Sequence, residues 1–183
     1  MTEFENRQNW DLGSWPEMYG KLKELQAMIF LSPPGRELNL MVFTVSSLAA
    51  GCRHCQAHGA YGLDRAGLPI EKIQGLWDFE SSDHFSDRER AALRFGVAAG
   101  TSPSAVDPDH HADLRAHFTD EEARSLLAVT ALGGFMNRYN DGLATVTDAE
   151  SSDWAAINLA PVGWDIGKHT GAVHEQRSGP PGR

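Results

Sequence analysis

The sequence has no apolar run long enough to cross a membrane, and it carries little positive charge. Its most apolar stretch, residues 126–136, is shorter than the roughly 18 residues of a membrane span and is flanked by charge. Lys and Arg number 16 against 25 Asp and Glu, a formal net charge of −9. Nucleic acids and anionic membranes attract concentrated Lys and Arg, so we expect neither as a partner. Residues 1–9 carry no apolar secretion signal, so we expect a cytoplasmic protein.

Cysteine is also scarce, with two residues in a chain of 183. A chain of this length buries roughly 70% of its unfolded surface, so it folds without a disulfide or a structural metal. Cys52 and Cys55 are therefore free for chemistry. In a reducing compartment, two such cysteines are more typical of a catalytic, redox or metal-binding site than of a structural crosslink.

Signals for β-hairpins are absent, whereas helical periodicity is frequent. No Asn-Gly or Asp-Gly turn separates two alternating strands. Two capping boxes, Ser86 to Glu89 and Thr119 to Glu122, mark helix starts. The apolar run in residues 36–50 fits either a buried strand or a buried helix, and its length favours the helix. We therefore predict an all-α fold, with helices over residues 15–30, 36–50, 52–63, 70–79, 86–99, 108–117 and 119–142, and no clear periodicity after residue 154.

The sharpest chemical feature is a CxxC motif at a predicted helix start, in the segment Gly51-Cys-Arg-His-Cys-Gln-Ala-His58. One helical turn separates the two cysteines, which places their side-chain roots about 5–6 Å apart. A small adjustment would permit a disulfide. The helix dipole favours a thiolate at this place, and His58 could accept or relay its proton. The arrangement is typical of a dithiol redox centre.

Other interpretations of this motif remain open. The cysteines could be small buried apolar residues, or they could bind zinc together with His58, although a fourth ligand is missing. A thioredoxin-like fold would place a strand over residues 40–45, but it requires further strands, and none is predicted after residue 66. Covalent haem needs a histidine directly after the second cysteine, where Gln56 stands.

Two further clusters of polar residues stand out. His110, His111 and His117 lie among aspartates, a pattern that indicates an exposed, charged helix more simply than a metal site. The second cluster lies on the otherwise apolar helix 119–142 and consists of Asn137, Arg138, Asn140 and Asp141. Because buried polar groups need partners, we expect a hydrogen-bond network at a helix or subunit contact there.

Residues 47–58 resemble the redox motif of the carboxymuconolactone decarboxylase superfamily, specifically its alkylhydroperoxidase D-like, peroxidase-related branch. The likeness continues in order through residues 85–95, 117–122, 135–145 and 163–169. It covers roughly residues 15–170, which we interpret as one helical domain. Residues 1–14 are then an N-terminal lead, and residues 171–183, rich in Ser, Gly and Pro near the end, are expected to be a disordered tail.

The resemblance implies an all-helical bundle that assembles as a homo-oligomer, a trimer or hexamer, with the dithiol in a pocket between helices. It implies that Cys55 attacks a small hydroperoxide and becomes a sulfenic acid. Cys52 would then resolve it to a disulfide, with His58 in the proton relay. A dithiol such as lipoamide, or a thioredoxin-type protein, would reopen the disulfide. The resemblance implies no cofactor and no metal.

Two positions depart from the family pattern. The family commonly places a histidine seven residues after the first cysteine, but Gly59 stands there and the histidine comes one residue earlier. Its relay glutamate usually lies twelve residues before the first cysteine, where this chain has Leu40; Glu37, one turn away, is the candidate substitute. Two alternatives therefore stay open: a cofactor-free lactone decarboxylase or isomerase of the same superfamily, and a non-catalytic thiol sensor.

Overall fold

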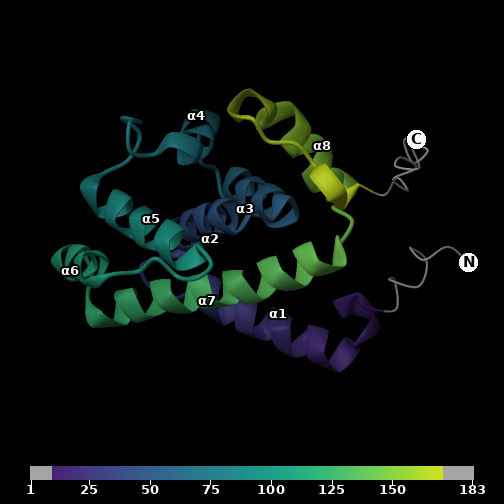
Figure 1. The fold of residues 1–183 in the computed structure, drawn as a ribbon, viewed down its shortest axis with the longest axis horizontal. Coiled ribbons are helices and arrows are strands. Elements are labelled where there is room, and N and C mark those ends of the chain that lie inside the picture. Colours follow the sequence, from purple (N-terminus) through teal and green to yellow (C-terminus); the bar gives the residue numbers. More distant parts are fainter. Residues whose placement is uncertain (1–9, 171–183) are drawn as a thin grey trace, which may run out of the picture.

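The computed structural model describes residues 10–170 and confirms the all-α prediction (Figure 1). The predicted tail and residues 1–9 of the predicted lead lie outside the described residues. Between residues 10 and 170 the chain forms α-helices and short 3-10 turns, without a strand. No helix in this range is both long and apolar enough to span a membrane. The helices are α1 (Pro16–Phe30), α2 (Arg36–Ala50), α3 (Arg53–Arg65), α4 (Ile70–Gly75), α5 (Asp87–Gly100), α6 (Pro108–His117), α7 (Asp120–Leu143) and α8 (Ala149–Asn158).

Capping boxes begin three of these helices, and the sequence predicts two of them. Ser86 and Thr119 form complete capping boxes at the starts of α5 and α7, and both predictions are confirmed. A further box begins α6, where Asp107 accepts from the backbone of His110 and the His110 ring contacts the same carboxylate. His110 therefore acts as a capping residue at the start of an exposed helix.

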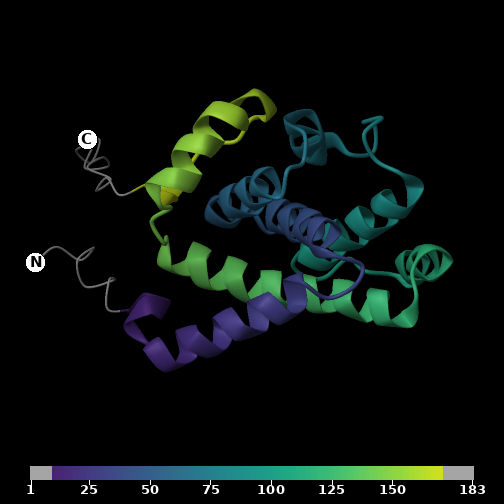
Figure 2. The same cartoon turned by 180° about the vertical axis from the view of Figure 1, so that it is seen from behind.

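Helix α2 lies at the centre of the bundle, between α3, α5 and α7 (Figures 1 and 2). Every residue from Leu38 to Ser47 is buried. A helix that is covered on all sides needs apolar residues around its whole circumference, so its sequence loses the alternation of an amphipathic helix. This burial explains why the run in residues 36–50 also resembles a buried strand.

Helix α5 approaches α2 closely because glycines face it. A Cβ atom added to Gly100 would lie 2.4 Å from the backbone oxygen of Ser46, and one added to Gly96 would lie 2.9 Å from a methyl group of Val45. Both distances are shorter than van der Waals contact. The two backbones can therefore pack directly against each other only because these positions lack side chains.

The chain after residue 154 is more ordered than its sequence pattern indicates. Helix α8 continues to Asn158, with Asp148 as its N-cap. Residues 159–170, which we call the C-terminal strap, then return along α3, where the Trp164 indole donates a hydrogen bond to the backbone oxygen of Arg53. Ala155, Leu159 and Trp164 are buried against the core, and this tertiary packing stabilises a segment with little helical periodicity of its own.

Candidate active site

The two cysteines lie where α2 ends and α3 begins. Gly51 adopts a left-handed conformation with φ of 77°, which ends α2, and the Cys52 amide donates back to the Ser47 carbonyl at 3.1 Å. A left-handed residue at a helix end strongly favours glycine. The chain thus turns directly into α3, whose N-cap is Cys52, and the Cys52 sulfur accepts from the Cys55 backbone amide at 3.4 Å.

Both sulfurs are free thiols, and they share one hydrogen bond. Cys52 is 0% exposed and Cys55 is 2% exposed. The hydrogen bond from the Cys55 thiol, with smaller contributions from His169 and the Cys55 amide, lowers the pKa of Cys52 to about 5 against the opposing effect of burial. The same hydrogen bond, burial and the Cys52 charge raise the pKa of Cys55. These opposite pKa shifts favour a state of the reduced pair in which Cys52 carries the negative charge and Cys55 carries the proton.

His169 of the C-terminal strap lies against Cys52 and is 0% exposed. Its Nδ1 donates to the Thr145 carbonyl at 2.8 Å. Its Nε2 is buried without a partner at regular hydrogen-bond geometry and lies 3.6 Å from Oδ1 of Asp141. Burial alone would lower the pKa of His169, but its interactions with Cys52 and the Thr145 carbonyl outweigh burial and raise the pKa. Sequence reasoning gave this residue no role, although it closes the last block of the family resemblance.

His58 and His54 lie one turn apart on α3, with ring centroids separated by 4.3 Å. His58 contacts the backbone oxygen of His54 through Nδ1 at 2.9 Å and Asp148 through Nε2 at 2.7 Å. His54 contacts the Thr147 hydroxyl at 3.1 Å, and burial, followed by the charges of His58 and His169, lowers the pKa of His54 to about 3. His54 is therefore a neutral ring near the thiols, whereas both nitrogens of His58 face acceptors other than a cysteine.

The structure gives a steric reason for the glycine at position 59. A Cβ atom on Gly59 would lie 2.4 Å from the Thr44 hydroxyl and 3.1 Å from the Phe43 ring, both on α2. A histidine fits there only if the side chains of Thr44 and Phe43 shift. The neighbouring position, His58, is half-buried at the pocket wall and is free to contact Asp148.

Glu37 and Leu40, the two candidate relay positions on α2, lie in different places. Leu40 lines the pocket beside the dithiol, where its side chain is apolar. Glu37 is exposed and lines a separate depression together with Ser86 and Arg88. The structure therefore brings Cys52, Cys55 and His58 into one region and places Glu37 outside it.

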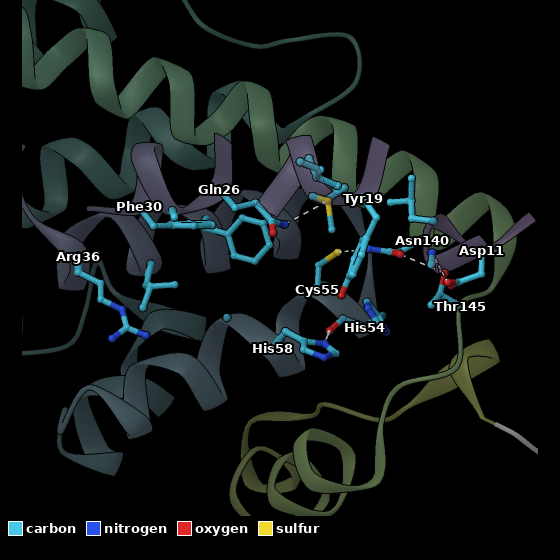
Figure 3. A pocket seen from close by; sticks show the side chains of 18 of the residues that line it. Asp11, Tyr19, Gln26, Phe30, Arg36, His54, Cys55, His58, Asn140 and Thr145 are labelled. Carbon is cyan, nitrogen blue, oxygen red and sulfur yellow. Dashed lines mark hydrogen bonds between the residues drawn. The ribbon is translucent and has the colours of Figure 1, made fainter. Parts of the chain in front are cut away.

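A pocket of about 730 Å³ opens onto Cys55 (Figure 3). Helices α1, α2, α3 and α7 form its walls together with residues 11–13. The Cys55 sulfur lies between His58 on one side and Asn140 on the other, with Arg36 and Asp11 toward opposite ends of the pocket. Much of the wall is apolar and consists of Leu22, Phe30, Leu40, Phe43 and Met136. Cys52 and His169 do not line this pocket.

The polar cluster on α7 forms a network at a helix contact, as the sequence predicts. The Ser47 hydroxyl donates to Oδ1 of Asn137 at 2.9 Å, which joins α2 to α7. One turn further on, Nδ2 of Asn140 contacts the Cys55 sulfur at 3.6 Å, and the Thr145 hydroxyl donates to its Oδ1 at 3.0 Å. Asn140 thus also belongs to the dithiol site, a role that its position on the helix alone does not reveal.

The zinc interpretation requires His58 to join the two cysteines. Its ring nitrogens instead contact the His54 backbone oxygen and Asp148. Among residues 10–170, no group of three His, Cys, Asp or Glu side chains is arranged to hold a metal ion. The described residues therefore do not fit a zinc site.

Comparison with known protein sequences gives a match over part of the chain. No family model matches the sequence. The uncharacterised protein YnjA of Escherichia coli strain K12 is 37% identical over 76 residues, which is 40% of this chain and 40% of that protein. The chain thus matches less than half the length of this curated relative.

Solved structures extend the likeness over most of the chain. The debrominase Bmp8 is 31% identical in its apo structure, over 76% of this chain and 75% of that one, with a TM-score of 0.71. A cysteine-to-alanine variant of Bmp8 in complex with 2,3,4-tribromopyrrole gives 29% identity over 82% and 79% of the two chains and a TM-score of 0.74. A peroxidase-related protein from Ralstonia eutropha JMP134, described as an alkylhydroperoxidase AhpD core, has the same fold at 24% identity, over 74% and 73% of the chains, with a TM-score of 0.65.

The fold and the site together define a helical bundle with a buried dithiol at a helix start. The chain belongs to the same family as the debrominase Bmp8, and it has the fold of the alkylhydroperoxidase AhpD core, in agreement with the superfamily that its sequence resembles.

Proposed function

We propose that this protein is a dithiol-dependent reductase that reduces small hydroperoxides through Cys55 and Cys52. The observation that carries the proposal is the buried pair of adjacent free cysteines, one sulfur of which lies at the wall of a largely apolar pocket. A thiolate is the nucleophile in attack on an O–O bond, and a second thiol one turn away traps the sulfenic acid before further oxidation.

The two cysteines have different roles in the proposed reaction, because one carries the resting negative charge and the other faces the pocket. The resting negative charge lies on Cys52, but Cys55 is the cysteine that faces the pocket. Because the two sulfurs share a hydrogen bond, the proton of Cys55 can move to Cys52 as the substrate binds. Cys55 is then the attacking thiolate, and Cys52 is a thiol that is ready to act as an acid.

The reaction balances with the residues present. The Cys55 thiolate attacks the terminal oxygen of the hydroperoxide, the O–O bond breaks, and the departing alkoxide takes the proton held by Cys52. This step leaves an alcohol, a sulfenic acid on Cys55 and a thiolate on Cys52. The Cys52 thiolate then displaces hydroxide from the Cys55 sulfur to form the disulfide. Asn140 contacts the Cys55 sulfur through an N–H group and supports negative charge there.

A dithiol reductant and a homo-oligomeric state complete the proposal. Dihydrolipoamide or a thioredoxin-type protein returns the disulfide to two thiols in the reducing cytoplasm. A homo-oligomer, which the family resemblance implies to be a trimer or hexamer, is supported by exposed apolar side chains on and beside α1 and α7, two helices that lie side by side (Figures 1 and 2). These residues are Leu25 and Met28 on α1, Leu31 directly after it, and Leu127 and Phe135 on α7. Apolar surface of this kind is typical of an interaction site.

Reductive dehalogenation is a second candidate, favoured by the likeness to Bmp8, a debrominase. The rings of Tyr19, Phe30 and Phe43 line the pocket and offer flat apolar contacts to a halogenated aromatic ring. The Cys55 thiolate would displace halide from the ring carbon and form a carbon–sulfur bond. The Cys52 thiolate would then attack the Cys55 sulfur to form the disulfide, and the departing ring carbon would take a proton, so the dithiol supplies the two electrons.

The test is a titration of free thiols in the reduced protein before and after one equivalent of cumene hydroperoxide, with mass spectrometry to locate any crosslink. We expect both thiols to disappear together into a Cys52–Cys55 disulfide that dihydrolipoamide reopens. Cys55→Ser should abolish peroxide consumption, whereas Ser104→Ala, in an exposed loop, should leave it unchanged.

Other outcomes assign the alternatives. Turnover of a bromopyrrole without turnover of hydroperoxide identifies a dehalogenase. A disulfide that forms and is reopened without sustained peroxide turnover identifies a thiol sensor. Thiols that stay unreactive in the folded protein contradict the proposal and favour the lactone decarboxylase or isomerase.

A further inference from the structure

Cys52 interacts with two groups of opposite character. The Cys55 thiol donates to its sulfur, and the imidazole of His169, fully buried in the C-terminal strap, is its second neighbour. Cys55 lines the pocket, whereas Cys52 and His169 do not, so this imidazole is not part of the wall that a substrate would meet.

The hydrogen bonds of His169 leave one ring nitrogen available. Nδ1 donates to the Thr145 carbonyl, so it carries a hydrogen atom. Nε2 is buried and lacks a partner at regular geometry. A buried polar atom without a partner destabilises the fold, so a change that provides a partner is favoured. A proton on Nε2, directed toward the Cys52 thiolate, is such a change.

The other charged and titratable groups near the ring fit this arrangement. Asp141 on α7 faces Nε2 at 3.6 Å, but it also binds Lys168 at 2.7 Å, which offsets its charge. His54 on α3 has its ring centroid 5.7 Å away and is neutral. The remaining neighbour is Cys52 itself, which supplies the anion only while it is a thiolate.

We propose that His169 is the positively charged partner of the Cys52 thiolate in the reduced protein, and that it gives up its Nε2 proton when the two cysteines form a disulfide. The proposal rests on the dithiol chemistry proposed above. Without the Cys52 charge, a buried imidazolium would lose most of the interaction that compensates for its desolvation.

The proton balance of the cycle supports this coupling. The reduced site contains the Cys55 thiol, the Cys52 thiolate and the His169 imidazolium. In the first step the alkoxide receives the Cys55 proton by way of Cys52. In the second step the hydroxide displaced from Cys55 needs one more proton to become water. His169 releases one proton from Nε2 to solvent, which balances the proton that the hydroxide takes up. The charges of the Cys52 thiolate and the His169 imidazolium cancel before oxidation, and the disulfide and the imidazole are both neutral afterwards.

Two measurements on the wild-type protein test the proposal without a substitution. Nitrogen NMR of the histidine rings reports whether Nε2 of His169 is protonated, first in the reduced protein and then after oxidation with diamide, which forms a disulfide without any peroxidase activity. We expect a protonated Nε2 in the reduced protein and a neutral ring in the oxidised protein at the same neutral pH. The same protonation state in both forms overturns the proposal.

A variant provides an independent readout. In His169→Gln, the thiolate absorbance of the reduced protein should appear at a pH about 1–3 units higher than in the wild type, because an adjacent positive charge has been removed. His84→Gln, which replaces an exposed histidine in a loop, is the matched control and should titrate like the wild type. Asp141→Asn should lower the pH at which the Nε2 proton is lost, because it removes a nearby negative charge.

The outcomes separate this proposal from the proposed function. If diamide forms the disulfide and His169 changes its protonation state, but hydroperoxides are not consumed, the charge pair stands and the peroxidase proposal fails. If hydroperoxides are consumed but thiolate titration is the same in His169→Gln and the wild type, the peroxidase proposal stands and the role of His169 is refuted.

Discussion

Replacing Gly100 by alanine should separate the two central helices. The new Cβ would lie 2.4 Å from the backbone oxygen of Ser46 and 2.8 Å from its Cα. Both atoms belong to the backbone of α2, so no side-chain rotation relieves the clash, and the C-terminal end of α5 must move away from α2. Overpacking of this kind costs about 1–3 kcal/mol of the free energy of unfolding.

A second glycine gives the matched control. Gly20 lies inside α1, and a Cβ there meets no atom within 4 Å. Gly20→Ala should therefore raise the free energy of unfolding by about 0.5–1 kcal/mol through its effect on backbone entropy. The two alanine variants should differ by roughly 2–4 kcal/mol in urea unfolding monitored by circular dichroism. If Gly100→Ala unfolds at the same urea concentration as Gly20→Ala, the close approach of α5 to α2 is refuted.

Two further predictions concern the site. His54→Gln should remove part of the acid sensitivity of the fold. Burial lowers the pKa of His54 in the folded protein from 6.5 to about 3. At pH values between these two pKa values, the unfolded state therefore binds the proton more tightly than the folded state. The free energy of unfolding therefore falls as pH drops through this window, by up to about 1.4 kcal/mol per pH unit from this residue. On acidification the free energy of unfolding of the wild type should fall more than that of the variant. If urea unfolding gives the same difference between the two proteins at every pH, this prediction is contradicted. Asn140→Ala removes the N–H group that contacts the Cys55 sulfur, so it should slow the loss of thiols with hydroperoxide by about tenfold, or about 1.4 kcal/mol. An unchanged rate in stopped flow, with unchanged thermal stability, would show that Asn140 only connects helices.

Local signals in the sequence predict most of the fold. Capping residues such as Ser86 and Thr119 act within one turn, so their effect is visible without knowledge of the tertiary structure. The end of α8 is different, because Ala155 and Leu159 are held by packing against distant residues. Such a segment has weak periodicity, and its helix depends on contacts that a linear pattern does not contain.

In the candidate site too, local signals predict some residues, whereas tertiary contacts bring in others. Cys52, Cys55 and His58 lie within two turns of one helix, so a local motif is enough to bring them together. His169 belongs to the strap, more than a hundred positions after Cys52 in the sequence. The one signal for it in the sequence is its place at the end of the family-like block 163–169, which does not indicate contact with a cysteine. Gly59 and Leu40 were recognised as departures from the family, but only the packing of α3 on α2 explains the glycine.

The burial of both sulfurs has a kinetic consequence. Cys52 is 0% exposed, and Cys55 meets the exterior only through the pocket. In the proposed cycle, the hydroperoxide and the thiol that reopens the disulfide must therefore enter by the same opening, one after the other. Such an enzyme follows ping-pong kinetics, and each reactant at high concentration competitively inhibits the half-reaction of the other. A slender reductant such as dihydrolipoamide can reach Cys55 through this opening more readily than a globular partner.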